Sequence, residues 1–232
     1  MSIALRRTGQ RDSAISYMEL APGVTVGDWG CLACSICAIL PHYGILDGFP
    51  LMLSKFKSVG ALLQTGDLKG SVNWDGLREA YPNLSFMGRF KVNGVGETGG
   101  FSFAEAERRM TKLCQCGIPP LVHIDVTGDF RGDHFIVLID PDSFTCFDPW
   151  KNEIGTLSRL YGDPEKIVTG FSVLLGKPVD AAEPADYAHR MGDIDKGTAA
   201  AKVMEVWNEL NDRGIKDSKL FYLKEAAEEL IM

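Results

Sequence analysis

Cysteine can serve as a nucleophile, a metal ligand or a buried apolar residue, and one cysteine of this chain stands at the start of a predicted helix. Cys31 follows Gly30 and begins an apolar stretch that ends at Gly44. This pattern predicts a short helix over residues 31–40, with Asp28 placed to cap its first turn. At the start of a helix, the free backbone N–H groups and the positive end of the dipole favour thiolate over thiol. We therefore interpret Cys31 as a nucleophile.

A cysteine nucleophile needs a general base and a group that orients the base. Of the four histidines, His134 begins the apolar stretch 134–140, and Asp148 ends the next one, 143–148. The Asp-Pro-Asp-Ser run at 140–143 has the chemistry of a tight turn. The two stretches are therefore predicted to pair as antiparallel strands, which would bring His134 beside Asp148. Taken singly, each residue has a plainer interpretation as a strand-end or turn residue.

The other cysteines leave two alternatives open. Cys34 lies one turn deeper in the predicted helix and is the second candidate nucleophile. Buried cysteine packs as a small hydrophobic residue, which is the interpretation we favour for Cys34 and Cys37. The spacing of three residues would also suit a metal or iron–sulfur site completed by later cysteines, namely Cys114, Cys116 or Cys146. The apolar residues between the first three favour packing, so no metal and no cofactor are expected.

Composition excludes several classes of protein. The chain has 232 residues, of which 45% are hydrophobic and 24% charged, as in an ordinary globular protein. A formal net charge of −7 offers no basic surface for nucleic acid. No apolar run approaches the roughly 20 residues that span a bilayer, and residues 1–10 lack the apolar segment of a signal peptide. We expect synthesis in the cytoplasm, with no nucleic-acid partner and no membrane span.

The elements that must position these residues change type along the chain. After a loop over 10–30, the apolar periodicity predicts helices over 31–40, 48–66, 73–81 and 102–114. The last of these begins with Ser102 and Glu105, which form a capping box. Strand patterns follow over 120–125, 134–140, 143–148 and 166–175. Helices first and an antiparallel sheet second predict an α+β fold.

The chain divides into three predicted parts. Residues 1–176 form the domain that carries the cysteine, histidine and aspartate. Residues 177–198, with several prolines, alanines and aspartates, are predicted to be a linker. Residues 199–232 are predicted to form a helical hairpin that breaks at Gly214. Its apolar face would dock on the domain or join two copies of the chain in a homo-oligomer.

The order of these motifs resembles that of the papain-like cysteine peptidases of the bacteriocin-processing type (clan CA) and their stand-alone relatives. The resemblance covers roughly residues 8–176. It is carried by four motifs in order: Gly30-Cys31 through Tyr43-Gly44, Gly117-Ile-Pro-Pro-Leu-Val, His134-Phe-Ile-Val-Leu, and Asp148-Pro-Trp150. The elements Gln10-Arg-Asp12 and Asn73-Trp-Asp75 are similar to the family's as well. The resemblance implies a papain-like α+β fold.

The resemblance also implies a Cys31–His134–Asp148 triad that hydrolyses peptide or amide bonds. Cys31 would attack the carbonyl, His134 would move the proton, and Asp148 would hold the imidazole. The oxyanion would be met by the Cys31 backbone N–H and a side-chain amide. The glutamine usual six residues before the cysteine falls at Thr25. Gln10 matches an earlier glutamine of the stand-alone relatives and is the expected donor.

The end of the chain indicates a class of substrate. Residues 207–223 resemble the helical C-terminal unit of some phage and bacterial cell-wall lytic enzymes, so a cell-wall peptide is the refined substrate hypothesis. The protein would then act at the cell wall or be packaged in a virion. A second hypothesis is a catalytically silent relative of the peptidases that binds a partner or builds a virion. Thr25 in place of the usual glutamine is its main support.

Overall fold

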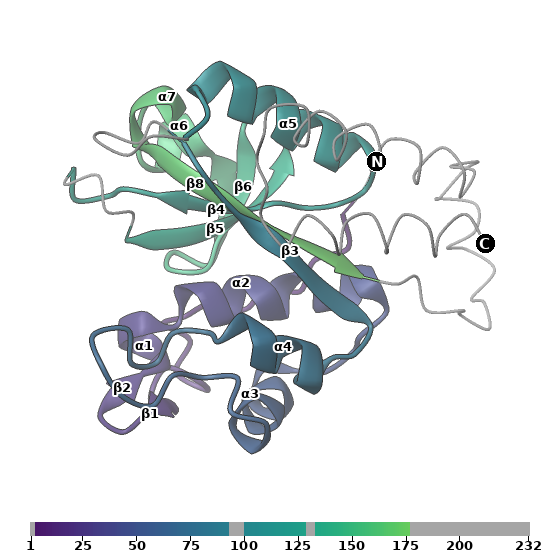
Figure 1. Cartoon of the computed structure of the whole chain (residues 1–232). Coiled ribbons are helices and arrows are strands. Elements are labelled where there is room, and N and C mark those ends of the chain that lie inside the picture. The colour runs from purple at the N-terminus through teal and green to yellow at the C-terminus, as the bar shows by residue number, and fades with distance from the viewer. Residues whose placement is uncertain (1–2, 93–99, 129–132, 177–232) are drawn as a thin grey trace, which may run out of the picture. The chain divides into compact units, whose positions relative to one another are not determined.

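The computed structural model describes residues 3–92, 100–128 and 133–176, and the structural statements below concern those residues. The predicted linker over 177–198 and the predicted hairpin over 199–232 lie outside them, so both stay predictions. Figure 1 shows helices gathered on one side of a sheet and a further long helix on the other side.

The sheet has six strands in the order β3-β8-β4-β5-β6-β7, and each neighbouring pair is antiparallel. The strands are β3 (Leu84–Lys91), β4 (Leu121–Ile124), β5 (His134–Asp140), β6 (Thr145–Asp148), β7 (Glu153–Thr156) and β8 (Val168–Gly176). A separate hairpin near the start of the chain consists of β1 (Glu19–Ala21) and β2 (Val24–Thr25). The antiparallel sheet confirms the predicted α+β class at this coarse level.

Most of the helices precede the sheet along the chain. They are α1 (Val26–Trp29), α2 (Cys31–Ile39), the 3₁₀ helix η1 (Leu40–Tyr43), α3 (Phe49–Ser58), α4 (Trp74–Ala80), α5 (Phe103–Gln115), α6 (Leu157–Leu160) and α7 (Pro164–Ile167). Gly44 ends the α2–η1 run in the left-handed conformation, with φ of 72°. Ser102 caps α5 by accepting a hydrogen bond from the Glu105 backbone N–H, which is one half of the predicted capping box. The Glu105 carboxylate pairs with Arg108 and Arg109.

Helix α2 lies at the centre of the core. All its residues except Leu32 are buried, because nearly every position is apolar or small and no face has to meet water. The helix contacts β5, where Ser35 Oγ donates to the Phe135 carbonyl at 3.3 Å. Side chains from one face of the sheet, among them Val137 and Phe147, share its apolar cluster. The helix that carries Cys31 is thus fixed on the sheet.

The opposite face of the sheet is covered by α5 (Figure 1). Ile136 and Leu138 alternate with the α2-facing residues of β5 and are fully buried. Ala106 and Met110 of α5 are fully buried as well. The sheet is therefore buried on both faces at β5, the strand that begins with His134.

Three local predictions were wrong. Asp28 does not cap α2: Gly30 is the N-cap, and the Asp28 carboxylate accepts from Thr25 Oγ1 at 2.6 Å within α1. The helix predicted over 48–66 ends at Ser58, because Gly60 turns the chain with φ of +68° and Leu62 pairs with Val72. The loop predicted over 10–30 contains β1, β2 and α1.

Candidate active site

A glycine turn places Cys31 at the start of α2. Helix α1 ends at Trp29, and Gly30 alone separates it from α2. A Cβ atom on Gly30 would lie 2.4 Å from the Val26 carbonyl oxygen, so only glycine allows this close approach. Cys31 keeps 9% of its surface exposed, whereas Cys34 keeps none. Among the three thiols of this helix, Cys31 is therefore the one that solvent reaches.

The β5–β6 hairpin brings His134 and Asp148 together. Val137 lies opposite Phe147 in the hairpin, and continuing this register puts Asp148 on the same side of the strands as His134. His134 Nε2 donates to Asp148 Oδ1 at 2.8 Å. Both side chains are buried. The turn at 140–143 thus positions the imidazole and the carboxylate, as the sequence indicates.

His134 is also joined to the thiol. The Cys31 side chain interacts with His134 closely enough to raise its pKa, and since Nε2 faces Asp148, Nδ1 is the nitrogen left for the sulfur. Burial alone would lower the pKa of His134, but the hydrogen bond to Asp148 and the interaction with the Cys31 side chain raise it to about 9. At neutral pH the imidazole in this setting therefore carries a proton.

Asp148 is held as a carboxylate by three donors. Oδ1 accepts from His134 Nε2 and from the Trp150 backbone N–H, each at 2.8 Å, and Oδ2 accepts from the Tyr161 hydroxyl at 2.7 Å. Burial alone would raise the pKa of Asp148, but the hydrogen bonds from His134, Tyr161 and Trp150 lower it. The side chain is fully buried, so these donors replace its water shell.

Tyr161 is a site residue that sequence reasoning missed. It follows α6, a helix of only four residues that no apolar periodicity announces. Burial and the Asp148 carboxylate beside it raise the pKa of its hydroxyl, which therefore stays a donor. Its ring lies 5.7 Å from the His134 ring, and Lys151 Nζ lies 4.0 Å from the centre of the Tyr161 ring. Tyr161 is thus a positioning residue for Asp148.

Trp150 packs on the same imidazole. Its ring meets the His134 ring edge-on, with 6.1 Å between the ring centres and 81° between the planes. The side chains of His134 and Asp148 are both buried, so little water reaches the bond between them. A drier environment strengthens that bond.

Gln10 is hydrogen-bonded to two segments of the chain, the turn before Cys31 and the residues that follow Asp148. Its Nε2 donates to the Gly27 carbonyl at 3.0 Å, and its backbone N–H donates to the Pro149 carbonyl at 2.7 Å. The side chain is fully buried, and its Oε1 atom has no hydrogen-bond partner among the described residues. Thr25, in contrast, is bonded to Asp28. The predicted oxyanion residue therefore lies beside the turn ahead of Cys31 and next to the residue after Asp148.

The remaining buried cysteines do not form a second site. Burial raises the pKa of Cys34 and Cys37, and it raises the pKa of Cys114 and of Cys146 to about 12. All cysteines of the described part are free thiols. No group of three or more histidine, cysteine, aspartate or glutamate side chains in that part is arranged to hold a metal ion. These cysteines pack as small apolar residues.

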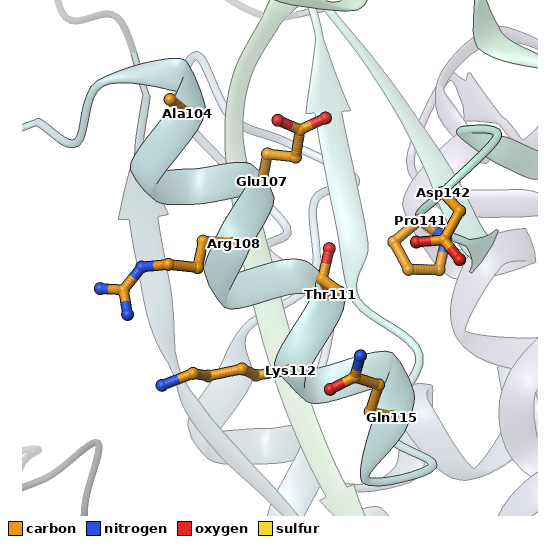
Figure 2. Close-up of a pocket in the computed structure, with 8 residues that line it drawn as sticks. All are labelled: Ala104, Glu107, Arg108, Thr111, Lys112, Gln115, Pro141 and Asp142. Carbon is orange, nitrogen blue, oxygen red and sulfur yellow. The ribbon is translucent and has the colours of Figure 1, made fainter.

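A surface hollow of about 520 Å³ lies away from the triad (Figure 2). Figure 2 shows Pro141 and Asp142 of the β5–β6 turn facing helix α5 across it. On the α5 side it is lined by Ala104, Glu107, Arg108, Thr111, Lys112 and Gln115. Cys31, His134 and Asp148 are not among the residues that line it.

Comparisons with known proteins do not assign the chain to a family. No family model matches the chain, and a search of curated proteins finds no match. Within residues 3–92, 100–128 and 133–176, no helix is both long and apolar enough to cross a bilayer.

Proposed function

We propose that the chain is a papain-like cysteine peptidase, a thiol-dependent hydrolase of peptide or amide bonds. The observation that carries the proposal is the hydrogen bond between His134 and Asp148, together with the interaction of His134 with the Cys31 side chain at the start of α2. A nucleophile, a base and an orienting carboxylate in that order are the parts of covalent acyl transfer. The antiparallel sheet packed against a helix that begins with the nucleophile supports the papain-like fold assignment.

The proposed reaction proceeds in two halves. The Cys31 thiolate attacks the carbonyl carbon, and the C=O π electrons move to oxygen as a tetrahedral oxyanion. When the oxyanion collapses, the C–N bond breaks, the leaving amine takes the proton from His134, and a thioester remains on Cys31. Water then attacks the thioester while His134 accepts its proton. The acid leaves, and the proton on His134 restores the ion pair with the Cys31 thiolate.

The substrate class that we propose is a peptide, with cell-wall peptides as its refinement. The refinement rests on the resemblance of residues 207–223 to the helical unit of cell-wall lytic enzymes, and these residues lie outside the described part. A location at the cell wall or in a virion is part of the same proposal. The alternative, a silent relative that binds a partner or builds a virion, predicts an ordinary thiol at Cys31.

The pH dependence of Cys31 alkylation tests the proposal. With iodoacetamide, labelling of Cys31 should remain fast at pH 6, where an ordinary thiol with a pKa of about 8.5 is almost wholly protonated. His134→Ala should slow labelling at pH 6 about a hundredfold, because the imidazolium that stabilises the thiolate is gone. Mass spectrometry of the peptide containing residue 31 gives the rate at each pH.

Cys116 provides an internal reference in the same experiment. It is a partly exposed free thiol at the C-terminal end of α5, so His134→Ala should leave its labelling rate unchanged. Slow labelling of Cys31 that parallels Cys116 and is unchanged by His134→Ala would reject the triad. That outcome would favour the silent binding or virion protein.

The oxyanion role of Gln10 has a separate expected result. Nε2 has two hydrogens, and the bond to the Gly27 carbonyl uses one of them, so the other is available to a developing oxyanion. Gln10→Ala should lower kcat about 10²- to 10³-fold, as loss of one oxyanion donor does in other acyl-transfer enzymes. The alkylation rate of Cys31 should stay unchanged, because alkylation forms no oxyanion.

Gln64→Ala is the matched control for Gln10→Ala. Gln64 is an exposed glutamine whose Nε2 also donates to a backbone carbonyl, that of Leu62. This variant should keep full kcat. If Gln10→Ala keeps kcat as well, the second oxyanion donor is another group.

A further inference from the structure

A cation stands beside the proposed catalytic site. The guanidinium carbon of Arg11 lies 3.9 Å from the centre of the Trp150 ring, over its face. Trp150 in turn meets the His134 ring edge-on at 6.1 Å between centres. These two distances place the guanidinium within about 10 Å of the imidazole, about three extended residues of a peptide.

The backbone fixes Arg11 in this place. The N–H of Gln10, the preceding residue, donates to the Pro149 carbonyl at 2.7 Å. A Cβ atom on Gly9 would lie 2.7 Å from Asn152 Cγ, so glycine allows the two segments to approach closely. The segment 9–11 is thus packed on the residues that follow Asp148, and the stacking of Arg11 on Trp150 is part of that packing.

The donors of Arg11 are turned to solvent. The residue is exposed, and among the residues that the structure describes no carboxylate or carbonyl accepts a hydrogen bond from it. The neighbouring Asp12 carboxylate accepts instead from the Ala14 backbone N–H at 2.9 Å. Stacking uses the face of a guanidinium and leaves its N–H edge for another group. A planar carboxylate matches that edge with two parallel hydrogen bonds.

We propose that Arg11 is a specificity residue that binds a carboxylate on the leaving-group side of the scissile bond. The proposal rests on the function proposed above. Because His134 gives its proton to the leaving amine, the leaving half of the peptide passes His134 and then Trp150. An extended residue spans about 3.3–3.6 Å and an acidic side chain adds its own reach, so a carboxylate on one of the first two residues after the bond can reach Arg11. The net charge of −7 disfavours acidic substrates in general, so the attraction of an acidic substrate to this site depends on a local cation.

A pair of alkylating peptides tests this assignment without requiring hydrolysis. One is a bromoacetyl-alanyl-glutamate amide, and its twin carries glutamine in place of glutamate. The second-order rate constant for labelling Cys31 should be about tenfold larger for the glutamate reagent, since a charge-assisted pair forms with Arg11. Arg11→Gln should remove this preference and leave the rate with the glutamine reagent unchanged.

Arg7→Gln is the matched control, because Arg7 is an exposed arginine four residues earlier in the chain. It should retain the preference for glutamate, which shows that total charge is not the cause. Equal labelling by both reagents in the unmodified protein, or a preference that survives Arg11→Gln, overturns the proposal. Failure of the proposed function appears elsewhere, as absent peptide cleavage, and does not alter the labelling ratio.

Discussion

Replacing Cys31 by alanine is expected to lower the rate of peptide hydrolysis at least about 10⁴-fold, the scale seen when a covalent nucleophile is removed. Alanine cannot form the thioester, so the first half of the proposed reaction has no nucleophile. The fold should be retained, because the side chain loses one sulfur atom at a position that is still in contact with solvent. Release of new amino groups from purified peptidoglycan and from unfolded peptides measures the rate.

Cys34→Ala is the control for this prediction. Cys34 lies one turn further along α2, is fully buried, and has a raised pKa that keeps it a thiol. Its replacement removes one buried sulfur atom and should cost about 1 kcal/mol of stability while leaving hydrolysis per folded molecule unchanged. If Cys31→Ala retains hydrolysis, or if Cys34→Ala loses it at full folding, the assignment of the nucleophile is wrong.

The positions of Cys31, His134 and Asp148 could be predicted from the sequence because each stands at the end of an element with a strong local signal. Gly30 precedes an apolar helix, and the turn at 140–143 joins two apolar strands. Turn chemistry sets the register of a hairpin, and the register sets which side chains are neighbours. The position of His134 beside Asp148 therefore depends on local interactions that sequence reasoning can follow.

The residues around the triad depend on tertiary packing, which leaves no comparable signal. Arg11 and Trp150 are 139 residues apart in the sequence, and no periodicity connects them. Tyr161 follows a helix too short to show an apolar face. Strand β3 was missed because a bulge at Gly88, with φ of +137°, interrupts its alternation of side chains.

The error in the predicted C-terminal end of α3 has a similar cause. The apolar pattern continues past Ser58 to Ala61 and Leu62, which are indeed buried. They are buried in a turn and an isolated bridge, since Gly60 takes the left-handed conformation. Burial alone therefore does not distinguish a helix from an irregular segment, and only a capping signal would have ended the helix correctly.

Asp148→Ala is expected to lower hydrolysis about 10³- to 10⁴-fold and the free energy of unfolding by about 3–5 kcal/mol. The reason is that His134, Trp150 and Tyr161 each lose the acceptor that satisfies a donor in a buried site. His134 would also lose the group that fixes its ring. Chemical denaturation measures the change in the free energy of unfolding. The rate of hydrolysis per folded molecule measures the effect on the reaction.

Asp148→Asn separates the geometry of this group from its charge. The amide oxygen can still accept from His134 and Trp150, and the amide nitrogen can donate to the Tyr161 hydroxyl oxygen. The free energy of unfolding should therefore change far less than in Asp148→Ala. The charge, however, is lost, and with it the main interaction that raises the pKa of His134 to about 9.

The pH dependence of kcat/KM shows whether loss of the Asp148 charge lowers the pKa of His134. In the unmodified protein the imidazolium that protonates the leaving amine persists until the pH passes about 9, so hydrolysis should decline only above that value. In Asp148→Asn the decline should begin at lower pH, closer to the ordinary histidine pKa of about 6.5. Tyr161→Phe should leave the decline near its original pH or move it to higher pH, because the Asp148 charge is kept and the carboxylate loses a donor that shares it with His134. If Asp148→Asn leaves the decline of kcat/KM at high pH unchanged, the carboxylate does not control the proton on His134.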